Sequence, residues 1–189
     1  MRPAHTVLSF LLALVAVVGC GEGGDSESGE GATTTRGGVG DTLLTADDYE
    51  QDGRPVEERL RLTLEDVELR AKPEDPLAGI KKKGYRWAKV RVRLRQTGST
   101  PASVLVTQFA LLDSEGQRYP AEEAAAGIAE PELAPDSNAV DLEPEEARSG
   151  FLVFQVPDDA KITALSFKDL GYGPAPDSAR WVLRSKSRS

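Results

Sequence analysis

The sequence predicts an all-β protein, an antiparallel β-sandwich of about seven strands. Between residues 57 and 184, short apolar segments are separated by turns rich in glycine, proline and aspartate, which is typical of β-sandwiches. A parallel α/β fold requires strands that alternate with helices, and hence long segments with helical periodicity. Neither pattern follows the first 20 residues. About 130 residues suit a single domain of this class.

The amino-terminal residues predict a secretory signal peptide over residues 1–19. Arg2 precedes an apolar run from Val7 to Val18 that is interrupted only by Ser9. A helix of this length spans about 18 Å, which is short for a bilayer core of about 30 Å. The run has the length of the apolar region of a signal peptide.

The apolar run ends in Val17-Val18-Gly19-Cys20, which resembles the lipobox of bacterial lipoproteins. The resemblance implies that the sulfur of Cys20 receives a diacylglyceryl group and that a peptidase cleaves between Gly19 and Cys20. Two acyl chains hold a protein durably at a membrane, whereas one chain holds it marginally. We therefore expect an extracytoplasmic protein anchored to the cell membrane by Cys20. The alternative is an ordinary signal peptide in which the cysteine is accidental.

The residues after Cys20 predict a flexible acidic tether. Gly21 to Gly40 consists mostly of glycine, serine, threonine and acidic residues, and such a segment buries too little surface to offset the entropy of ordering. We assign residues 20–56 to the lipidated cysteine and the tether, 57–184 to the sandwich and 185–189 to a disordered tail. Thr42 to Thr45 fits a short edge strand, so the boundary between tether and domain stays open.

The first strand of the domain is expected from Arg59. Its apolar side chains alternate with polar ones as far as Leu64 and then continue at Val67 and Leu69 on the opposite parity. Because a slip of one residue turns over the faces of a strand, this pattern predicts a β-bulge near Glu65-Asp66.

The clearest strand is expected from Tyr85 to Thr97, where apolar and basic side chains alternate. The apolar face consists of Ala88, Val90, Val92 and Leu94, and the basic face consists of Lys89, Arg91, Arg93 and Arg95. Further strands are expected near residues 103–112, 117–119, 150–156, 162–167 and 179–184. The segment 120–150 reads as a long acidic loop that is broken by prolines, with room for one helical turn at 122–126.

Several segments, taken in their order along the chain, resemble an immunoglobulin-like domain of unknown function. They are Arg86–Val92, Phe109–Tyr119 with the pattern Phe-x-Leu-x-Asp-x-x-Gly-x-x-Tyr, Leu142–Glu145 and Gly150–Pro157. Related domains occur in secreted proteins and lipoproteins of Gram-positive bacteria, among them a mycobacterial secreted immunoprotective antigen. The resemblance implies a fold and an extracytoplasmic location but no activity. The family usually has Pro-Gly where this chain has Pro144-Glu145, so we expect a different turn there.

The residue inventory excludes most catalytic and metal-binding chemistry from the mature protein. The only histidine is His5 and the only cysteine is Cys20, so cleavage and acylation would leave neither imidazole nor free thiol. This excludes Ser-His-Asp triads, Cys-His nucleophiles, disulfides and zinc or haem sites built on these groups. The acidic loop from Glu122 to Glu146 lacks the spacing of a calcium loop, and no glycine-rich phosphate loop is present. We expect no cofactor, no metal and no enzymatic activity.

The basic face with Lys89, Arg91, Arg93 and Arg95 is the candidate contact for a polyanion. Such a face suits teichoic acids, acidic glycans or lipid headgroups. The alternative is a solvated outer face that is neutralised by neighbouring acidic residues. Residues 59–189 hold 20 acidic and 20 basic residues, so nucleic acid is not expected as a partner. Trp87 shares the parity of the basic side chains and fits a partly buried structural aromatic better than an exposed platform, and Trp181 fits the core.

The sequence therefore favours a membrane-anchored, non-enzymatic lipoprotein at the cell surface. Its sandwich is expected to bind a protein or an anionic envelope polymer, or to act as an accessory subunit. The alternative is a carboxylate-based hydrolase that acts on envelope material, for which the sequence nominates no pair of acids.

Overall fold

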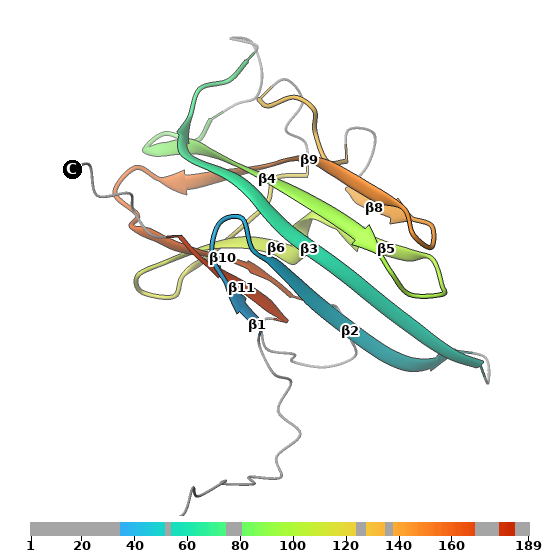
Figure 1. The fold of residues 1–189 in the computed structure, drawn as a ribbon. Helices are drawn as coiled ribbons and strands as arrows, with labels where there is room; N and C mark the ends of the chain where they lie inside the picture. Colours follow the sequence, from blue (N-terminus) through green and yellow to red (C-terminus); the bar gives the residue numbers. More distant parts are fainter. Residues whose placement is uncertain are drawn as a thin grey trace, which may run out of the picture. The chain divides into compact units, whose positions relative to one another are not determined.

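Two β-sheets stack face to face around an apolar core (Figure 1). One sheet, sheet A, has the strand order β1-β11-β10-β6-β7. Its strands are β1 (Thr35–Gly37), β11 (Ala179–Val182), β10 (Ile162–Phe167), β6 (Phe109–Asp113) and β7 (Arg118–Pro120). The other, sheet B, has the order β2-β3-β4-β9 and consists of β2 (Thr42–Gln51), β3 (Arg54–Ala71), β4 (Tyr85–Gln96) and β9 (Ala147–Pro157). A two-stranded sheet pairs β5 (Ala102–Leu105) with β8 (Ala139–Leu142), and a 3₁₀ turn, η1 (Val106–Gln108), joins β5 to β6.

The computed structural model describes residues 35–51, 54–74, 81–123, 128–134, 138–168 and 178–183, with side chains except at 35, 46–51 and 54–58. The expected signal peptide, Cys20, the first part of the tether and the tail at 185–189 lie outside the described residues. Part of the expected helical turn at 122–126 also lies outside them. Within the described residues, no helix is long and apolar enough to cross a membrane.

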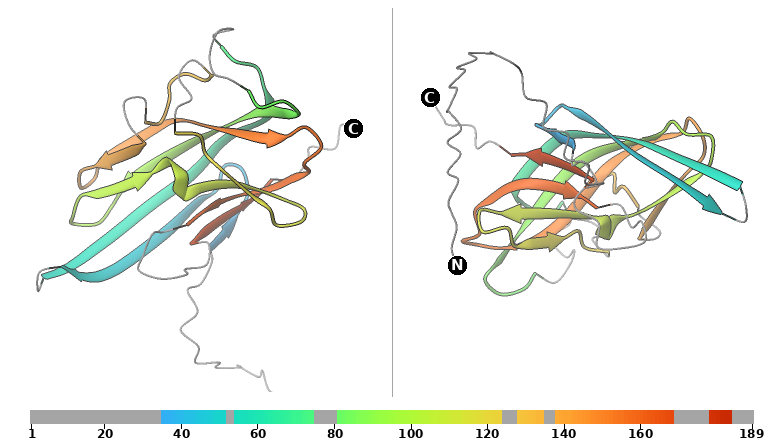
Figure 2. Two further views of the ribbon diagram at one scale, coloured as in Figure 1. Left: turned by 180° about the vertical axis from the view of Figure 1, so that it is seen from behind. Right: turned by 90° about the horizontal axis from the view of Figure 1, so that it is seen from below.

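The predicted all-β sandwich is confirmed, with more strands than the expected seven. β1 and β8 were not expected, because three or four residues leave little periodicity to detect. β2 was expected only as a short edge strand, and the single strand expected near residues 103–112 is divided into β5 and β6. The pairings between the named strands are antiparallel except for that of β1, which runs parallel to β11. The long β2–β3 hairpin projects beyond the other strands of sheet B (Figure 2).

The sandwich begins well before residue 57, so the assignment of 20–56 to a tether is corrected over residues 35–51. β2 continues past Thr45 to Gln51 and pairs with β3 along its whole length. Leu43 is only 4% exposed and belongs to the main core. The acidic composition of residues 46–50 concealed this strand, because it leaves no apolar alternation to detect.

The predicted β-bulge in β3 is confirmed. The pairing of β3 with β4 shifts register between Leu64 and Asp66. Leu64 is fully buried, whereas Val67 and Leu69 only pack against the rim of the core. The bulge therefore explains the change of parity after Leu64.

The main core fills the space between the sheets with side chains from both of them. Phe109 on β6 and Phe167 on β10 pack with ring centroids 4.9 Å apart. Trp181 on β11 is fully buried, as expected, and its indole N–H donates a hydrogen bond of 3.1 Å to the backbone oxygen of Asp41. This bond connects sheet A to the turn that leads into β2.

Residues 128–134, which we call the strap, wrap around the edge of β9 that does not face β4. The Leu133 N–H donates to the Phe151 oxygen at 3.0 Å, and the Phe151 N–H donates to the Pro131 oxygen at 2.8 Å. Leu133 reaches the main core, while Ile128 and Ala129 form a second apolar cluster with Trp87 and Val153. Trp87 is 6% exposed, which confirms that it is a structural aromatic and not an exposed platform.

Candidate functional site

The outer face of sheet B carries the basic side chains that the sequence singled out. Strand pairing across β2, β3, β4 and β9 aligns them in rows, because cross-strand partners share a face. One outward row consists of Leu44, Arg61, Arg95 and Ala147, and the next consists of Thr42, Thr63, Arg93 and Ser149. The alternate rows point into the core, where Leu62 and Leu94 are almost fully buried.

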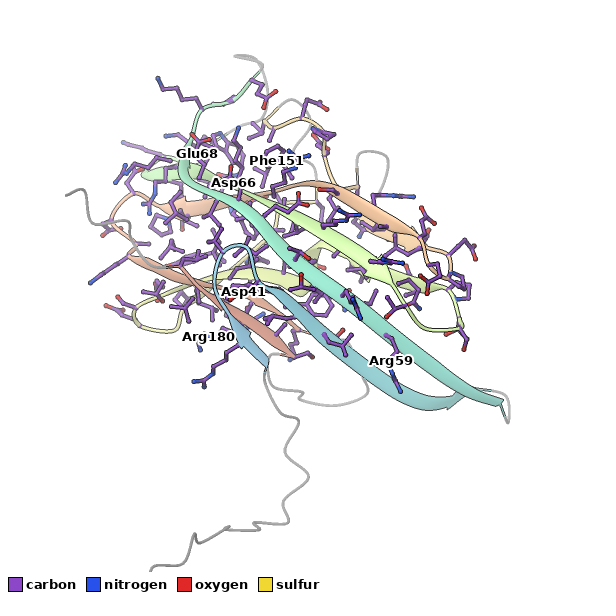
Figure 3. All side chains as sticks on the ribbon, viewed as in Figure 1. Asp41, Arg59, Asp66, Glu68, Phe151 and Arg180 are labelled. Carbon is purple, nitrogen blue, oxygen red and sulfur yellow. The ribbon has the colours of Figure 1, made fainter. Side chains whose placement is uncertain are left out.

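Lys89, at the strap end of this face, is neutralised by acidic side chains. Its Nζ lies 3.5 Å from Glu68 Oε2 and 3.6 Å from Glu74 Oε1. The same ammonium lies 5.0 Å from the centre of the Phe151 ring, and the side chain of Lys89 is only 16% exposed. Figure 3 shows Asp66, Glu68 and Phe151 gathered at this end of the sheet.

Arg91 is neutralised in a similar way. Its Nε lies 3.2 Å from Glu65 Oε2, although the two atoms are not aligned for a hydrogen bond. Ser149 donates a hydrogen bond of 2.8 Å to the same carboxylate oxygen. The structure therefore supports neutralisation by acidic residues for Lys89 and Arg91, as the alternative interpretation expected.

Three neighbouring arginines on the same face are more exposed than Lys89 and Arg91. We call them the arginine patch: Arg61, Arg93 and Arg95. Arg61 and Arg95 are direct cross-strand partners, and Arg93 lies two residues before Arg95 on the same face. In the described part of the chain, neither Arg61 nor Arg93 has an ion-pair partner. Arg61 was not among the candidate residues predicted from the sequence, although its alternation with Leu60 and Leu62 was a usable signal.

Arg95 has one acidic partner, Glu145, in the turn between β8 and β9. The Nη2 of Arg95 lies 2.7 Å from Glu145 Oε2, and the Glu145 side chain is 65% exposed. Glu145 has a φ of 67°, a left-handed conformation that costs a residue with a side chain about 1 kcal/mol. Glutamate thus occupies a backbone conformation that favours glycine.

The Phe-x-Leu-x-Asp-x-x-Gly-x-x-Tyr segment has a structural role in the β6–β7 hairpin. Asp113 Oδ1 accepts hydrogen bonds of 2.9 Å from the N–H groups of Glu115 and Gln117, and Oδ2 accepts one of 2.8 Å from the Tyr119 hydroxyl. Gly116 supplies a φ of 84° in the turn. Burial opposes ionisation of Asp113, but these hydrogen bonds prevail and lower its pKa.

Tyr119 is expected to stay protonated well into the alkaline range. Burial, followed by its hydrogen bond to the Asp113 carboxylate, raises the pKa of Tyr119 from 10.0 to about 12. The pKa of Tyr119 is higher in the folded state than the unfolded-state value of about 10. The contribution of its protonated hydroxyl to folding stability is therefore complete below about pH 10 and is lost as the pH rises through about 12. Chemical denaturation at about pH 8, 10 and 12 measures this loss of stability.

Tyr119→Phe provides the control for that measurement, because it keeps the ring and removes the titrating hydroxyl. The difference in unfolding free energy between wild type and variant should shrink as the pH rises above about 10. A constant difference across this window would contradict the role given to the hydroxyl.

Arg86 has a structural role that the sequence analysis missed. Its Nε donates to the Leu69 oxygen at 3.0 Å, its Nη2 donates to the Ala160 oxygen at 2.8 Å, and its Nη1 donates to the Pro157 oxygen. Burial, and then the charge of Arg70, lower the pKa of Arg86. The residue shares the inward parity of Ala88 and Val90, and an arginine on an apolar face was the available signal.

Acidic side chains line one shallow hollow beside the strap. Glu122, Glu123 and Glu132 border it together with Phe151, and its volume is about 20 Å³, room for a water molecule or two. Within the described residues, no group of three or more acidic, histidine or cysteine side chains is arranged to hold a metal ion.

The stacked sheets define an immunoglobulin-like β-sandwich that carries an exposed arginine patch on one outer face. Residues 38–176 match the family described as a domain of unknown function, DUF4352, and the chain belongs to this family. This confirms the resemblance drawn from the sequence. No curated protein sequence matches the chain significantly.

Two solved structures share this fold. A secreted protein from Mycobacterium tuberculosis, MPT63, is 16% identical with a TM-score of 0.53, and the match covers 80% of this chain and 98% of that one. A putative lipoprotein from Bacillus subtilis, YcdA, is also 16% identical, with a TM-score of 0.50 and coverage of 77% of this chain and 40% of that one. At these identities, the similarity concerns the fold alone.

Proposed function

We propose that the protein is an extracytoplasmic lipoprotein, anchored by an acylated Cys20, whose sandwich is a non-enzymatic binding module. The anchor is supported by the sequence Val17-Val18-Gly19-Cys20 after a short apolar run. The structural neighbours are in keeping with this location, since one is described as a secreted protein and the other as a putative lipoprotein.

The observation that carries the binding role is the exposed arginine patch on rigid central strands. Arg61 and Arg93 are exposed and have no ion-pair partner among the described residues. Surface charge is usually interspersed with the opposite sign, and this chain neutralises Lys89 and Arg91 in that way. A partner bound to the outer face of sheet B gives the remaining arginines a counter-charge.

Replacement of Cys20 by serine should release the protein from the membrane. Without the thiol no thioether to a diacylglyceryl group forms, so the protein loses two acyl chains and its durable anchoring. Incorporation of labelled palmitate and fractionation of membranes measure the two effects. Equal palmitate incorporation in wild type and Cys20→Ser would contradict the anchor, as would a mature wild-type protein that begins at another residue.

The binding face can be tested separately in intact cells. A photo-crosslinking residue at Ala147, which is exposed beside Arg95, should give adducts that disappear when Arg61 and Arg93 are both changed to Gln. Val182, 45% exposed on β11 of sheet A, is the matched control position and should give none. Equal crosslinking at both positions would argue against a specific face.

The carboxylate-based hydrolase remains the alternative proposal. The hollow bordered by Glu122, Glu123 and Glu132 brings acidic side chains together at the surface. A glycoside hydrolase places its two carboxyl groups on either side of a sugar ring, whereas this hollow has room for about 20 Å³. The binding module is therefore the function that the geometry favours.

A further inference from the structure

We propose that the arginine patch binds a linear polymer that carries phosphate groups. This inference rests on the proposed function, because it takes the outer face of sheet B as the binding surface. It adds the chemical class of the ligand and the residues that bind it.

The patch concentrates positive charge on a small area. Neighbouring strands lie about 4.8 Å apart, and residues two apart along a strand lie about 6.8 Å apart. Arg61 and Arg95 face each other across β3 and β4, and Arg93 lies one such step along β4. The two outward rows hold eight side chains, of which three are arginines and none is acidic.

Such an arrangement is unfavourable without a counter-ion. Like charges directly opposite each other on a sheet destabilise the pairing. Glu145 pairs with Arg95 from outside the two rows, but neither Arg61 nor Arg93 has an ion-pair partner among the described residues. A bound anion would relieve this repulsion.

The flat shape of the surface favours a polymer over a small anion. Sites for small molecules are concave and enclose most of the ligand, whereas this site is the outer face of a sheet. An extended polymer gains affinity by placing several charges on neighbouring guanidinium groups, since each additional contact is intramolecular.

The side chains around the arginines favour phosphate over carboxylate. Guanidinium groups bind phosphate oxygens in bidentate fashion. Thr63, the cross-strand partner of Arg93, lies beside it, and its hydroxyl is 2.7 Å from that of Thr42. One of the two hydroxyls donates to the other, and the second can donate to a ligand. A tetrahedral phosphate offers oxygens to the guanidinium group and to that hydroxyl at once, whereas a bidentate pair with the guanidinium group uses both oxygens of a planar carboxylate.

Glu145 competes with the polymer for Arg95. Its carboxylate holds the Arg95 guanidinium at 2.7 Å from a backbone with a φ of 67°. Replacement by glycine removes the competing charge and relieves the backbone at the same time. This change should therefore strengthen binding without harming the fold.

The experiment titrates the full chain, purified in a neutral detergent, with long-chain polyphosphate at low salt. With three arginines involved, the logarithm of the binding constant should fall with the logarithm of the salt concentration with a slope of about −2 to −3. Arg61→Gln combined with Arg93→Gln should weaken binding at least about tenfold, and Glu145→Gly should strengthen it about threefold.

Arg36→Gln combined with Arg180→Gln is the matched control. These residues are also cross-strand partners, on β1 and β11 of sheet A, so the change in net charge is the same. Binding should change by less than about twofold. Should the patch variant fail to fold, the gain expected for Glu145→Gly still decides the question.

Several results would overturn the proposal. The first is that the wild type does not bind polyphosphate. The second is that the sheet A control loses as much affinity as the patch variant, and the third is that Glu145→Gly gains no affinity. Equally tight binding of polygalacturonate would remove the preference for phosphate, and binding of phosphatidylglycerol vesicles in place of polyphosphate would indicate a membrane surface. If polyphosphate fails while Ala147 still crosslinks in cells, the ligand class is wrong and the proposed binding face stands.

Discussion

Replacement of Arg86 by methionine is expected to destabilise the fold by about 3 kcal/mol, because three carbonyl groups lose a charged donor. The three acceptors lie on β3, at the end of β9 and in the turn before β10. Arg86 therefore connects the end of sheet B to the start of a strand in sheet A. Methionine keeps most of the length of the side chain and none of the donors. Chemical denaturation of both proteins measures the difference.

Arg70→Met is the control for Arg86→Met. Arg70 is exposed and makes one long hydrogen bond, of 3.4 Å, to the Asp158 oxygen, so its replacement should cost less than about 0.5 kcal/mol. Arg86→Lys should fall between the two, because it keeps the charge without the planar set of donors. Equal stability of the two methionine variants would refute the role assigned to Arg86.

Gly150→Ala is expected to cost about 1–3 kcal/mol through overpacking. A Cβ at this position would lie 2.6 Å from both the Cα and the N of Leu133 and 2.7 Å from the carbonyl carbon of Glu132. These are backbone atoms of the strap, so no side chain can rotate away to make room. The strap must shift outward, and faster hydrogen exchange at Leu133 and Phe151 should accompany the loss of stability.

Gly38→Ala is a matched substitution with a different expected result. The nearest atom to a Cβ at Gly38 is Asp41 Oδ2 at 3.7 Å, an ordinary contact distance. The change should therefore be neutral or stabilise the protein by up to about 1 kcal/mol, because it restricts the unfolded chain. If both alanine variants lose the same stability, contact with the strap is not the cause.

The strands with strong local alternation could be predicted from the sequence, and those without such alternation could not. The pattern from Tyr85 to Thr97 predicted β4 to within one residue, and the parity change after Leu64 predicted the bulge. β2 was mostly missed because Leu43 is its only apolar side chain described as buried, so the segment shows no apolar alternation although it forms a hairpin with the next strand, β3. An acidic, glycine-rich neighbourhood outweighed that one signal.

The candidate site was predicted in part. Alternation correctly placed Lys89 and Arg95 on one face, but it does not tell which of them is neutralised. That difference arises from the bulge in β3, after which Glu68 pairs with Lys89, and from β9, which places Phe151 beside the same ammonium. The exposed arginines emerged only once the register of β3 and β4 was known, since register places Arg61 beside Arg95.

The strap also covers part of the sheet edge formed by β9, where a further strand could otherwise pair. The edge of a sheet offers unpaired N–H and C=O groups to any extended chain, and proteins commonly cover such edges to prevent aggregation. Here the main-chain groups of Phe151 and the oxygen of Val153 are already bonded to Pro131, Leu133 and Glu122. Pairing with a further extended chain is therefore blocked at Phe151 and Val153 on this side of β9.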